Sequence, residues 1–180
     1  MKKLKKFIVC TSINKPTSAV KKFDAMKDWE LVIVGDKKTP KNYKLKNGIY
    51  LSPKKQENID KKLSDLIGWN CIQRRNFGIL YAWKNGADIV AVVDDDNIPY
   101  KDWGKKLLER AADAGLKNAT LELASISIDA KKIGNTLNIT NTLEGLTRSS
   151  SATLEQKGRA FMLLGNLEKR LQDDRSSGRN

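Results

Sequence analysis

Short apolar runs, each ending in polar or acidic residues, punctuate the first half of the chain. They predict strands at Phe7–Cys10, Leu31–Val34 and Asp88–Val93, with a shorter strand at Gly48–Leu51. Uninterrupted apolar runs are typical of strands buried on both faces, and Asp88–Val93 is the clearest example. Strands of this kind that alternate with helices form a parallel sheet. The sequence therefore predicts an α/β fold with a parallel sheet.

Helical patterns separate the predicted strands. Ser18–Asp28 has apolar residues on one helical side, and a longer helical stretch runs over residues 58–84. Glycines mark two interruptions: a break near Gly68 and a left-handed stop at Asn85–Gly86. These helices supply the crossover connections that parallel strands require.

Polar residues follow three of the predicted strands, at Thr11–Asn14, Gly35–Asp36 and Asp94–Asp96. In open parallel sheets, ligands bind outside the carboxyl ends of the strands. We therefore expect these three segments to converge on one edge of the sheet and to form the functional site there.

The acidic triplet Asp94–Asp96 is the most informative of these segments. Alternate residues at a strand end point to opposite sides, so Asp94 and Asp96 can face one ligand while Asp95 faces away. Two carboxylates on one edge suit Mg²⁺ or Mn²⁺, which also bind phosphates. The alternative is an ordinary turn, because Asp, Asn and Pro are also the residues of chain reversals.

Asp36, Arg74 and Arg75 are further candidates. A carboxylate just after a strand can accept hydrogen bonds from a ribose or a base, although a turn or capping role is the favoured explanation of Asp36 taken alone. Two arginines can neutralise a diphosphate, but adjacent helical residues point about 100° apart, so at most one reaches a given ligand. Surface ion pairing is the alternative for Arg74 and Arg75.

Composition excludes several kinds of chemistry. The chain has no histidine, which rules out histidine bases and His-ligated zinc. Its net charge of +13 comes from 26 lysines and 8 arginines against 21 acidic residues. Scattered lysine pairs favour a solvated surface over a nucleic-acid interface, which favours clustered arginine.

Targeting features are few. Met1–Lys6 precedes only four apolar residues, fewer than a secretory signal needs, and no apolar run approaches the roughly 20 residues of a membrane helix. Cys10 and Cys71 form no disulfide framework. We expect a cytoplasmic protein without a membrane span.

Composition changes near Gly104, because residues 1–104 hold 11 of the 12 aromatic residues and Phe161 is the remaining one. We therefore divide the chain into residues 1–104 and an α+β extension, residues 105–180. Its patterns predict a helix at 105–114 and a strand at 120–128, and they leave 133–146 ambiguous. A second helix is predicted at 151–171, followed by a frayed end at 173–180. The apolar side of that helix consists of Leu154, Phe161, Leu164, Leu167 and Leu171.

Four motifs in residues 6–104 together resemble the STELLO-type glycosyltransferase-like proteins. More distantly, they are similar to the reversibly glycosylated polypeptides, which are UDP-arabinopyranose mutases. The motifs are FIVCTSINKPT at Phe7–Thr17, VIVGDKKTP at Val32–Pro40, NCIQRRNFG at Asn70–Gly78 and VDDDNIP at Val93–Pro99.

The resemblance implies a GT-A fold, whose Rossmann-like half-sheet binds a nucleotide-sugar and whose Asp-x-Asp motif holds Mn²⁺ or Mg²⁺. By position, Asp94 and Asp96 would be the metal ligands of that motif, and Asp36 would contact uridine. The implied nucleotide-sugar residues are Thr11, Asn14, Asp36, Arg74, Arg75, Asp94 and Asp95.

The resemblance implies a metal-dependent glycosyltransferase that uses a UDP-sugar and an unidentified acceptor. It does not extend into residues 105–180, so nucleotide-sugar binding is better supported than catalysis. The alternative is a non-catalytic nucleotide-binding or assembly module. Its C-terminal helix, with Leu154, Leu164 and Leu171 on one side, would bind a partner or form an oligomer.

Overall fold

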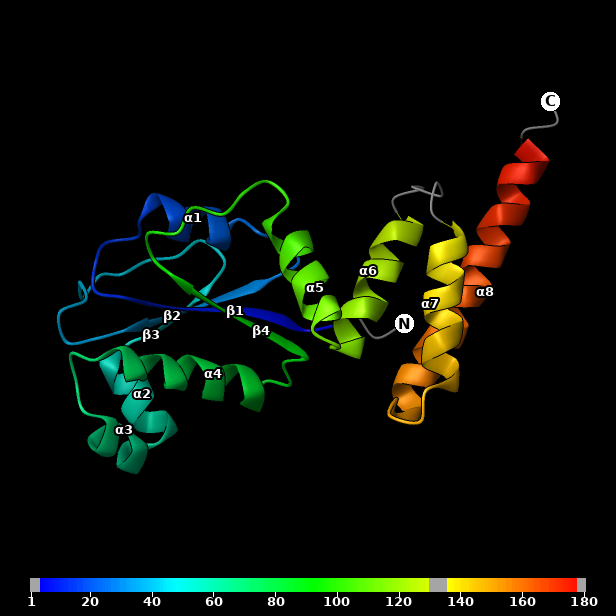
Figure 1. Ribbon diagram of the computed structural model, residues 1–180. Helices are drawn as coiled ribbons and strands as arrows, with labels where there is room; N and C mark the ends of the chain where they lie inside the picture. Colours follow the sequence, from blue (N-terminus) through cyan, green and yellow to red (C-terminus); the bar gives the residue numbers. More distant parts are fainter. Residues whose placement is uncertain (1–3, 130–135, 178–180) are drawn as a thin grey trace. The chain divides into compact units, whose positions relative to one another are not determined.

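The computed structural model describes residues 4–129 and 136–177 (Figure 1). The chain divides into two compact units, an N-terminal unit of residues 1–101 and a C-terminal unit of residues 102–180. The N-terminal unit contains the sheet, and the described part of the C-terminal unit is helical.

A four-stranded parallel sheet forms the centre of the N-terminal unit, in the order β3-β2-β1-β4. This confirms the predicted α/β fold with a parallel sheet. β1 lies between β2 and β4, with Cys10 opposite Ile33 on one side and Val93 on the other. The strands span Lys6–Ser12 (β1), Glu30–Gly35 (β2), Ile49–Leu51 (β3) and Ile89–Asp94 (β4).

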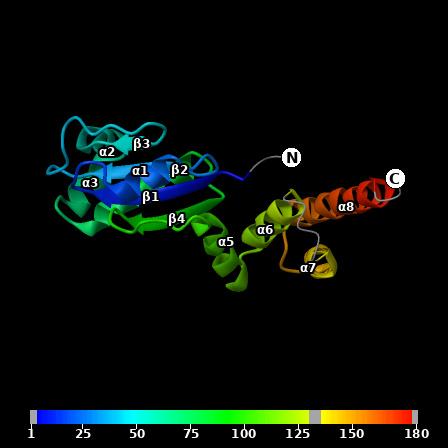
Figure 2. The same cartoon turned by 90° about the horizontal axis from the view of Figure 1, so that it is seen from above.

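Helices cover both faces of this sheet (Figures 1 and 2). α1 (Ser18–Asp24) lies on one face, and α2 (Pro53–Ile59), α3 (Lys61–Ile67) and α4 (Arg75–Lys84) lie on the other. A short 3-10 turn, η1 (Ile72–Arg74), leads into α4.

Glycines end two of these helices where the sequence predicted interruptions. Gly68 ends α3 with a φ of 71°, and Gly86 follows α4 with a φ of 74°. Residues other than glycine rarely adopt such positive φ values, which explains why the predicted single stretch divides where it does.

The core beneath α4 is packed closely against the sheet. Phe77 of α4 is fully buried in a cluster with β1 and β2 residues that include Val9 and Val34. A Cβ atom at Gly78 would lie 2.4 Å from Val9 Cγ1 and 2.8 Å from Val34 Cγ2. Glycine at this position therefore sets how near the helix lies to the sheet.

The expectation that Asp88–Val93 is buried on both faces is wrong. Within the described residues, β4 pairs on one side only, with β1, and Val92 is 43% exposed. Ile89, Val90 and Val93 are only partly buried. An apolar run does not distinguish an edge strand from a central one, because both have buried positions on a shared face.

Four helices make up the described part of the C-terminal unit, namely α5 (Trp103–Asp113), α6 (Lys117–Asp129), α7 (Thr136–Arg148) and α8 (Leu154–Ser177). The strand predicted at 120–128 is therefore wrong, and the described extension is helical rather than α+β. Leu121, Ala124 and Ile128 are all buried, at a helical spacing of three and four residues. The segment thus has both a helical spacing and the strand-like alternation of Leu121 and Leu123. The helix forms because its buried residues pack in the core of the unit.

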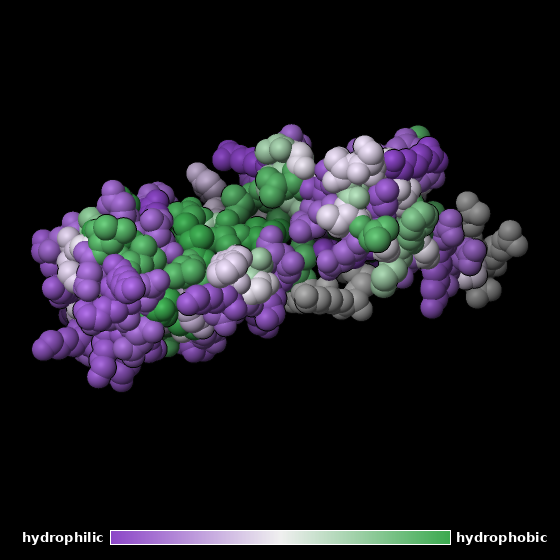
Figure 3. All heavy atoms as spheres, turned by 90° about the horizontal axis from the view of Figure 1, so that it is seen from below, coloured by the Kyte–Doolittle hydropathy of each residue, from purple (hydrophilic) through white to green (hydrophobic). Residues whose placement is uncertain are grey.

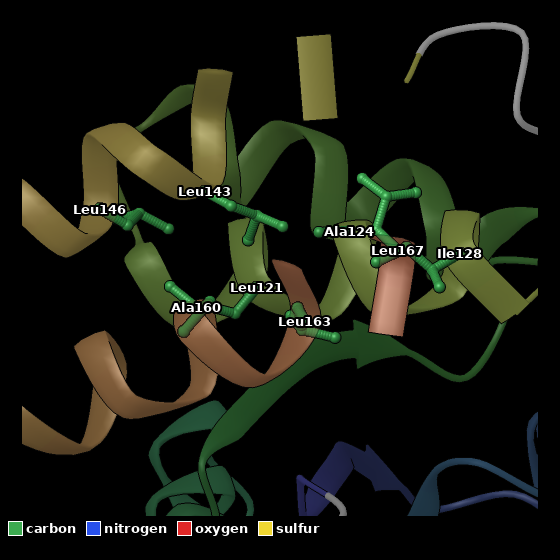
Figure 4. Packing of buried hydrophobic residues seen from close by; sticks show 8 residues of the cluster. All are labelled: Leu121, Ala124, Ile128, Leu143, Leu146, Ala160, Leu163 and Leu167. Carbon is green, nitrogen blue, oxygen red and sulfur yellow. The ribbon is translucent and has the colours of Figure 1, made fainter. Parts of the chain in front are cut away.

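An aliphatic core joins α6, α7 and α8 (Figure 4). Leu164 and Leu171 pack against it and Leu167 is buried in it, whereas Leu154 and Phe161 are 88% and 62% exposed. The single apolar side predicted for residues 151–171 is thus two separate faces. The cause is that α8 contacts its neighbours along one side only.

Two further segments of the extension, residues 133–146 and 173–180, are helical where the structure describes them. α7 covers the described part of the ambiguous segment, from Thr136, and residues 133–135 lie outside the described residues. α8 continues through Ser177, so residues 173–177 are helical, and residues 178–180 lie outside the description.

Hydrophilic residues cover much of the visible face of the N-terminal unit, at the left of Figure 3, between smaller hydrophobic groups. Among the described residues, no helix is both long enough and apolar enough to cross a membrane.

Candidate functional site

The carboxyl ends of β1, β2 and β4 form one edge of the sheet, and the strand order reverses there. The chain passes from β1 to β2 on one side of β1 and later returns to β4 on the other side. In doubly wound folds this reversal opens a crevice at the carboxyl edge, where ligands bind. The structure thus brings the three polar segments after β1, β2 and β4 to one edge.

A cavity of about 410 Å³ lies at this edge. Its polar lining comes from the ends of β1 and β2, from the segment after β4 and from the α3–α4 connection. The polar residues of this lining include Thr11, Ser12, Asn14, Asp36, Arg74 and Asp95. A larger cavity of about 650 Å³ lies at the opposite, amino end of β1 and β2. We assign function to the smaller one because it lies at the edge where parallel sheets bind ligands.

The expectation that Asp95 faces away from the site is wrong, because Asp95 is the member of the acidic triplet that lines the cavity. Its Oδ2 accepts hydrogen bonds from Ser12 Oγ at 2.5 Å and from Asn14 Nδ2 at 3.0 Å. The Thr17 hydroxyl donates to the Asp95 carbonyl oxygen. These bonds tie the residues after β4 to the residues after β1, and they fix the Asp95 carboxylate at the point of strand reversal.

Asp94 and Asp96 occupy different surroundings. Asp94 ends β4, opposite Thr11 of β1, and its Oδ1 lies 2.8 Å from Arg75 Nη2. The Asp94 side chain is 59% exposed, and Asp96 is also exposed. Both carboxylates are therefore open to solvent beside the cavity, and Arg75 partly balances the charge of the first.

Asp36 anchors the chain between β2 and the α3–α4 connection. Its Oδ1 accepts from Lys37 N–H at 2.6 Å and its Oδ2 from Asn70 N–H at 2.8 Å. Thr39 Oγ1 accepts from Asp36 N–H and donates to the Ser12 carbonyl, both at 2.7 Å. Asp36 therefore has a turn-forming role, and each of its oxygens keeps a lone pair for a ligand.

Arg74 lines the same cavity but is almost completely buried, at 1% exposure. Its guanidinium donates to Gln56 Oε1 at 2.9 Å, to Ser64 Oγ at 3.1 Å and to the Gly68 carbonyl at 3.2 Å. It also lies 3.7 Å from the centre of the Trp69 ring. Burial lowers the pKa of Arg74 from its usual range, while the charge of Asp36 opposes that shift.

One nitrogen of this guanidinium, Arg74 Nη2, is buried without a hydrogen-bond partner among the described residues. A buried donor without a partner carries a desolvation cost of about 1–3 kcal/mol. The Arg74 guanidinium therefore retains a donor nitrogen without an acceptor in the described part of the chain.

Two protonated groups lie behind the edge. Burial raises the pKa of the Cys10 thiol to about 12, and the negative charges of Asp95 and Asp94 add to this effect. Burial also raises the pKa of Tyr43, and a side-chain interaction with Ser12 opposes part of that shift. Both groups therefore stay neutral at physiological pH, and the charge of this edge comes from its carboxylates and arginines.

The donor set fits a divalent cation only in part. Among the described residues, no group of three or more acidic or cysteine side chains is placed to hold a metal ion. Mg²⁺ in phosphate sites is commonly held by one or two carboxylates together with ligand phosphates and water. Asp94 and Asp96 are two exposed carboxylates at this edge, and the first of them pairs with Arg75.

Sequence reasoning missed three contributors to the site. Gln56 is fully buried and donates to the carbonyl oxygens of Gly35 and Leu51, at 2.7 and 2.8 Å. Ser64 is buried against Arg74, and Asn70 adopts a positive φ of 58°. Gln56 and Ser64 read as ordinary polar helix residues, so no local signal marks them, whereas Asn70 follows a glycine break and could have been identified as a turn residue.

The fold and the site define the class of the N-terminal unit, which is an α/β unit with a candidate ligand cavity at the carboxyl edge of its sheet. No protein-family model matches the chain. Over 90 residues, half of the chain, it is 30% identical to "Probable glycosyltransferase STELLO2" and 29% identical to "Probable glycosyltransferase STELLO1", both of Arabidopsis thaliana. The match spans 12% of the length of these curated relatives. Over this half, the chain is thus distantly related to the two STELLO proteins, both named as probable glycosyltransferases.

Proposed function

We propose that the N-terminal unit binds a nucleoside diphosphate sugar, with UDP as the nucleotide, together with Mn²⁺ or Mg²⁺. The cavity of about 410 Å³ at the point of strand reversal carries this proposal, because it joins hydrogen-bonding groups for a nucleoside to charged groups for a diphosphate. The distant relationship to glycosyltransferases supports a sugar donor as the ligand.

The nucleoside end of the ligand is assigned to the Asp36 side of the cavity. Two backbone N–H groups hold the Asp36 carboxylate in place, and its remaining lone pairs can accept from a uracil N–H or a ribose hydroxyl. Thr11 and Asn14 contribute short polar side chains from the end of β1. The base would also contact Ile13 and Ile72, which line the cavity and are about half exposed.

The diphosphate end is assigned to the cationic side chains. Among the described residues, Arg74 Nη2 and Arg75 Nε are buried nitrogens without a hydrogen-bond partner, and Lys38 also lines the cavity. Charge-assisted hydrogen bonds to phosphate are about twice as strong as neutral ones. Arg75 lies at the same edge and neutralises Asp94, so that its guanidinium is placed to exchange a carboxylate partner for a phosphate.

Asp94 and Asp96 are the residues that would hold the cation, in the Asp-x-Asp arrangement. When bound, the cation supplies positive charge to the diphosphate and so stabilises it as a leaving group. Asp95 has a separate role in this proposal. By accepting from Ser12 and Asn14, it keeps the acidic turn in register with the end of β1.

Calorimetric titration of the full chain with UDP, with and without Mn²⁺, tests the proposal. We expect Mn²⁺-dependent binding that weakens at least tenfold in Asp96→Ala, which is about 1.4 kcal/mol of binding free energy. Asp65→Ala is the matched control, because Asp65 is an exposed aspartate that pairs with Lys61 on α3, away from the cavity lining.

If UDP binds neither with nor without Mn²⁺, the result would contradict the proposal as a whole. Mn²⁺-dependent binding that Asp96→Ala leaves intact would contradict the metal assignment alone.

A further inference from the structure

α8 carries a second apolar face that points away from the core of its unit. Leu154, Phe161 and Met162 are 88%, 62% and 51% exposed. Leu154, Gly158, Phe161 and Gly165 follow one another at spacings of four, three and four residues, which places them along one side of the helix. Exposed apolar residues grouped on one helix face are typical of an interaction surface.

The two glycines make this face uneven. A Cβ atom at Gly158 or at Gly165 would meet nothing within 4 Å, so each glycine leaves an open depression on the helix surface. Phe161 lies between the two depressions, three residues after the first and four before the second. The face therefore presents a bulky side chain flanked by two depressions, each of which can receive a side chain of a second helix.

We propose that two copies of this chain pair through α8 in antiparallel orientation, about a two-fold axis that passes between Phe161 and Met162. This axis places Phe161 of one copy level with Met162 of the other, and Gly158 level with Gly165. A face that contacts its own copy in this way is isologous and forms a closed dimer.

Side-chain direction favours the antiparallel arrangement over the parallel one. Long side chains on a helix lean toward its N-terminus, so Phe161 leans toward the level of its own Gly158. In the antiparallel pair that level carries Gly165 of the second copy, and the two rings are separated along the helix axis. A parallel pair in register would bring both Phe161 rings to the same level, where they compete for the same space.

The charged residues beside the apolar face are also arranged to pair across this two-fold axis. Lys157 and Glu168 border the face on one side, and Glu155 and Lys169 border it on the other. The two-fold axis brings Lys157 within two positions of Glu168 of the second copy, and Glu155 within one position of Lys169 of the second copy. Within the described part of the chain, none of these four side chains forms an ion pair of its own.

The contact is limited in size, which sets the kind of dimer to expect. The two helices overlap over residues 154–169, a length of about 24 Å. Leu154 would lie level with Lys169 of the second copy, whose alkyl chain can cover it. A contact of one helix per copy is at the lower end of specific interfaces, so dimerisation will depend on concentration. This inference does not depend on the proposed nucleotide site.

Sedimentation equilibrium of the full chain over a range of concentrations tests the proposal. We expect the apparent mass to rise from the 20.2 kDa of one chain toward twice that value. Phe161→Asp should abolish the rise, while circular dichroism should stay unchanged because Phe161 lies outside the core. A mass of one chain at every concentration for the unaltered protein would overturn the proposal.

A charge exchange separates the antiparallel dimer from the other arrangements. Lys157→Glu should weaken association roughly tenfold, because it sets like charges against each other at two symmetric places. Adding Glu168→Lys should restore association in an antiparallel dimer. In a parallel dimer Lys157 instead faces Glu155, so rescue by Glu155→Lys rather than by Glu168→Lys would overturn the antiparallel orientation.

Cross-linking measures the same orientation directly. Cys71→Ala provides the background, since Cys10 is buried and Cys71 is partly exposed. In that background, Met162→Cys should form a disulfide-linked dimer, because position 162 lies next to the two-fold axis. Leu154→Cys should not, because the two copies of position 154 lie about 22 Å apart along the helices. Efficient cross-linking of Leu154→Cys with none for Met162→Cys would overturn the proposal.

Discussion

The two units of this chain are held together by different means. In the N-terminal unit, buried polar side chains bridge segments that are distant in sequence, as when Asp95 accepts from Ser12 or Arg74 donates to Gln56. In the described part of the C-terminal unit, the cluster that joins α6, α7 and α8 is made of leucine, isoleucine and alanine. Its buried polar contacts are fewer, and include the ion pair of Arg159 with Glu122 at 3.8 Å.

Hydrogen-bond networks and apolar packing stabilise a protein in different ways. Hydrogen bonds are directional, so a network such as the one around Asp36 fixes the positions of loop atoms at a ligand-binding edge. Apolar packing is not directional, and it stabilises helices without defining a polar site. Both proposals fit this difference, with ligand recognition proposed for the N-terminal unit and self-association proposed for the C-terminal unit.

The largest effect is expected for Arg74→Ala. The substitution removes the donor to Gln56 Oε1 and to Ser64 Oγ and opens space beside Trp69, so the free energy of unfolding should fall by about 3–4 kcal/mol. Urea denaturation followed by circular dichroism measures it. Arg75→Ala is the matched control: it removes a partly exposed ion pair to Asp94 and should cost less than about 1 kcal/mol. Equal losses in the two variants would contradict the structural role of Arg74.

Leu163→Ala should have the next largest effect, through a different mechanism. Leu163 is 1% exposed in the aliphatic core, and its truncation leaves a cavity, with an expected cost of about 3 kcal/mol. Phe161→Ala, two positions away on the exposed side of α8, should change stability by less than about 1 kcal/mol. If Phe161→Ala proved the more destabilising of the two at low protein concentration, the assignment of inner and outer faces would be wrong.

Gly78→Ala tests the close packing of α4 on the sheet. The added methyl group would lie 2.4 Å from Val9 Cγ1, so helix and sheet must move apart, at a cost of about 1–3 kcal/mol. Gly158→Ala introduces the same change in α8 where nothing lies within 4 Å. It should be neutral or slightly stabilising in a dilute, monomeric sample, because alanine favours helix. Thermal unfolding of both variants gives the comparison.

Alkaline pH should give the smallest effect within the first pH unit above 9. The unfolded Cys10 thiol ionises near 9.0, whereas the folded thiol keeps its proton until its pKa of about 12. The unfolded state loses the proton first, so the free energy of unfolding falls as pH rises from 9 to 12, by at most about 1.4 kcal/mol per pH unit. Tyr43 acts in the same direction, because burial raises its pKa. Cys10→Ala should flatten the pH dependence, and an unchanged slope would contradict the burial of the thiol.

Local patterns in the sequence predicted the parts of the fold that local physics determines. The apolar runs of β1 and β2 identified buried strands, and Gly68 and Gly86 identified helix ends because only glycine readily adopts positive φ. The polar residues after β1, β2 and β4 were expected to meet at one edge, since parallel strands end together. These features need no information about distant contacts.

The remaining features depend on contacts between distant segments. The exposure of β4 follows from its place at the edge of the described sheet, and the sequence of one strand does not reveal its neighbours. The alternation of apolar residues in 120–128 was overridden when Leu121, Ala124 and Ile128 found partners on α7 and α8. The roles of the site residues in binding nucleotide and metal stay predictions.

Binding of UDP at the carboxyl edge of the N-terminal unit is the central claim, and NMR of the ¹⁵N-labelled chain titrated with UDP and Mg²⁺ tests it most directly. We expect the amide signals of residues 11–14, 36–38, 70–72 and 94–96 to shift together with a single saturation curve, because these segments line or border one cavity. Signals from α6, α7 and α8 should not follow that curve. Saturable shifts confined to the helical unit, or around the cavity at the amino end of β1 and β2, would contradict the claim.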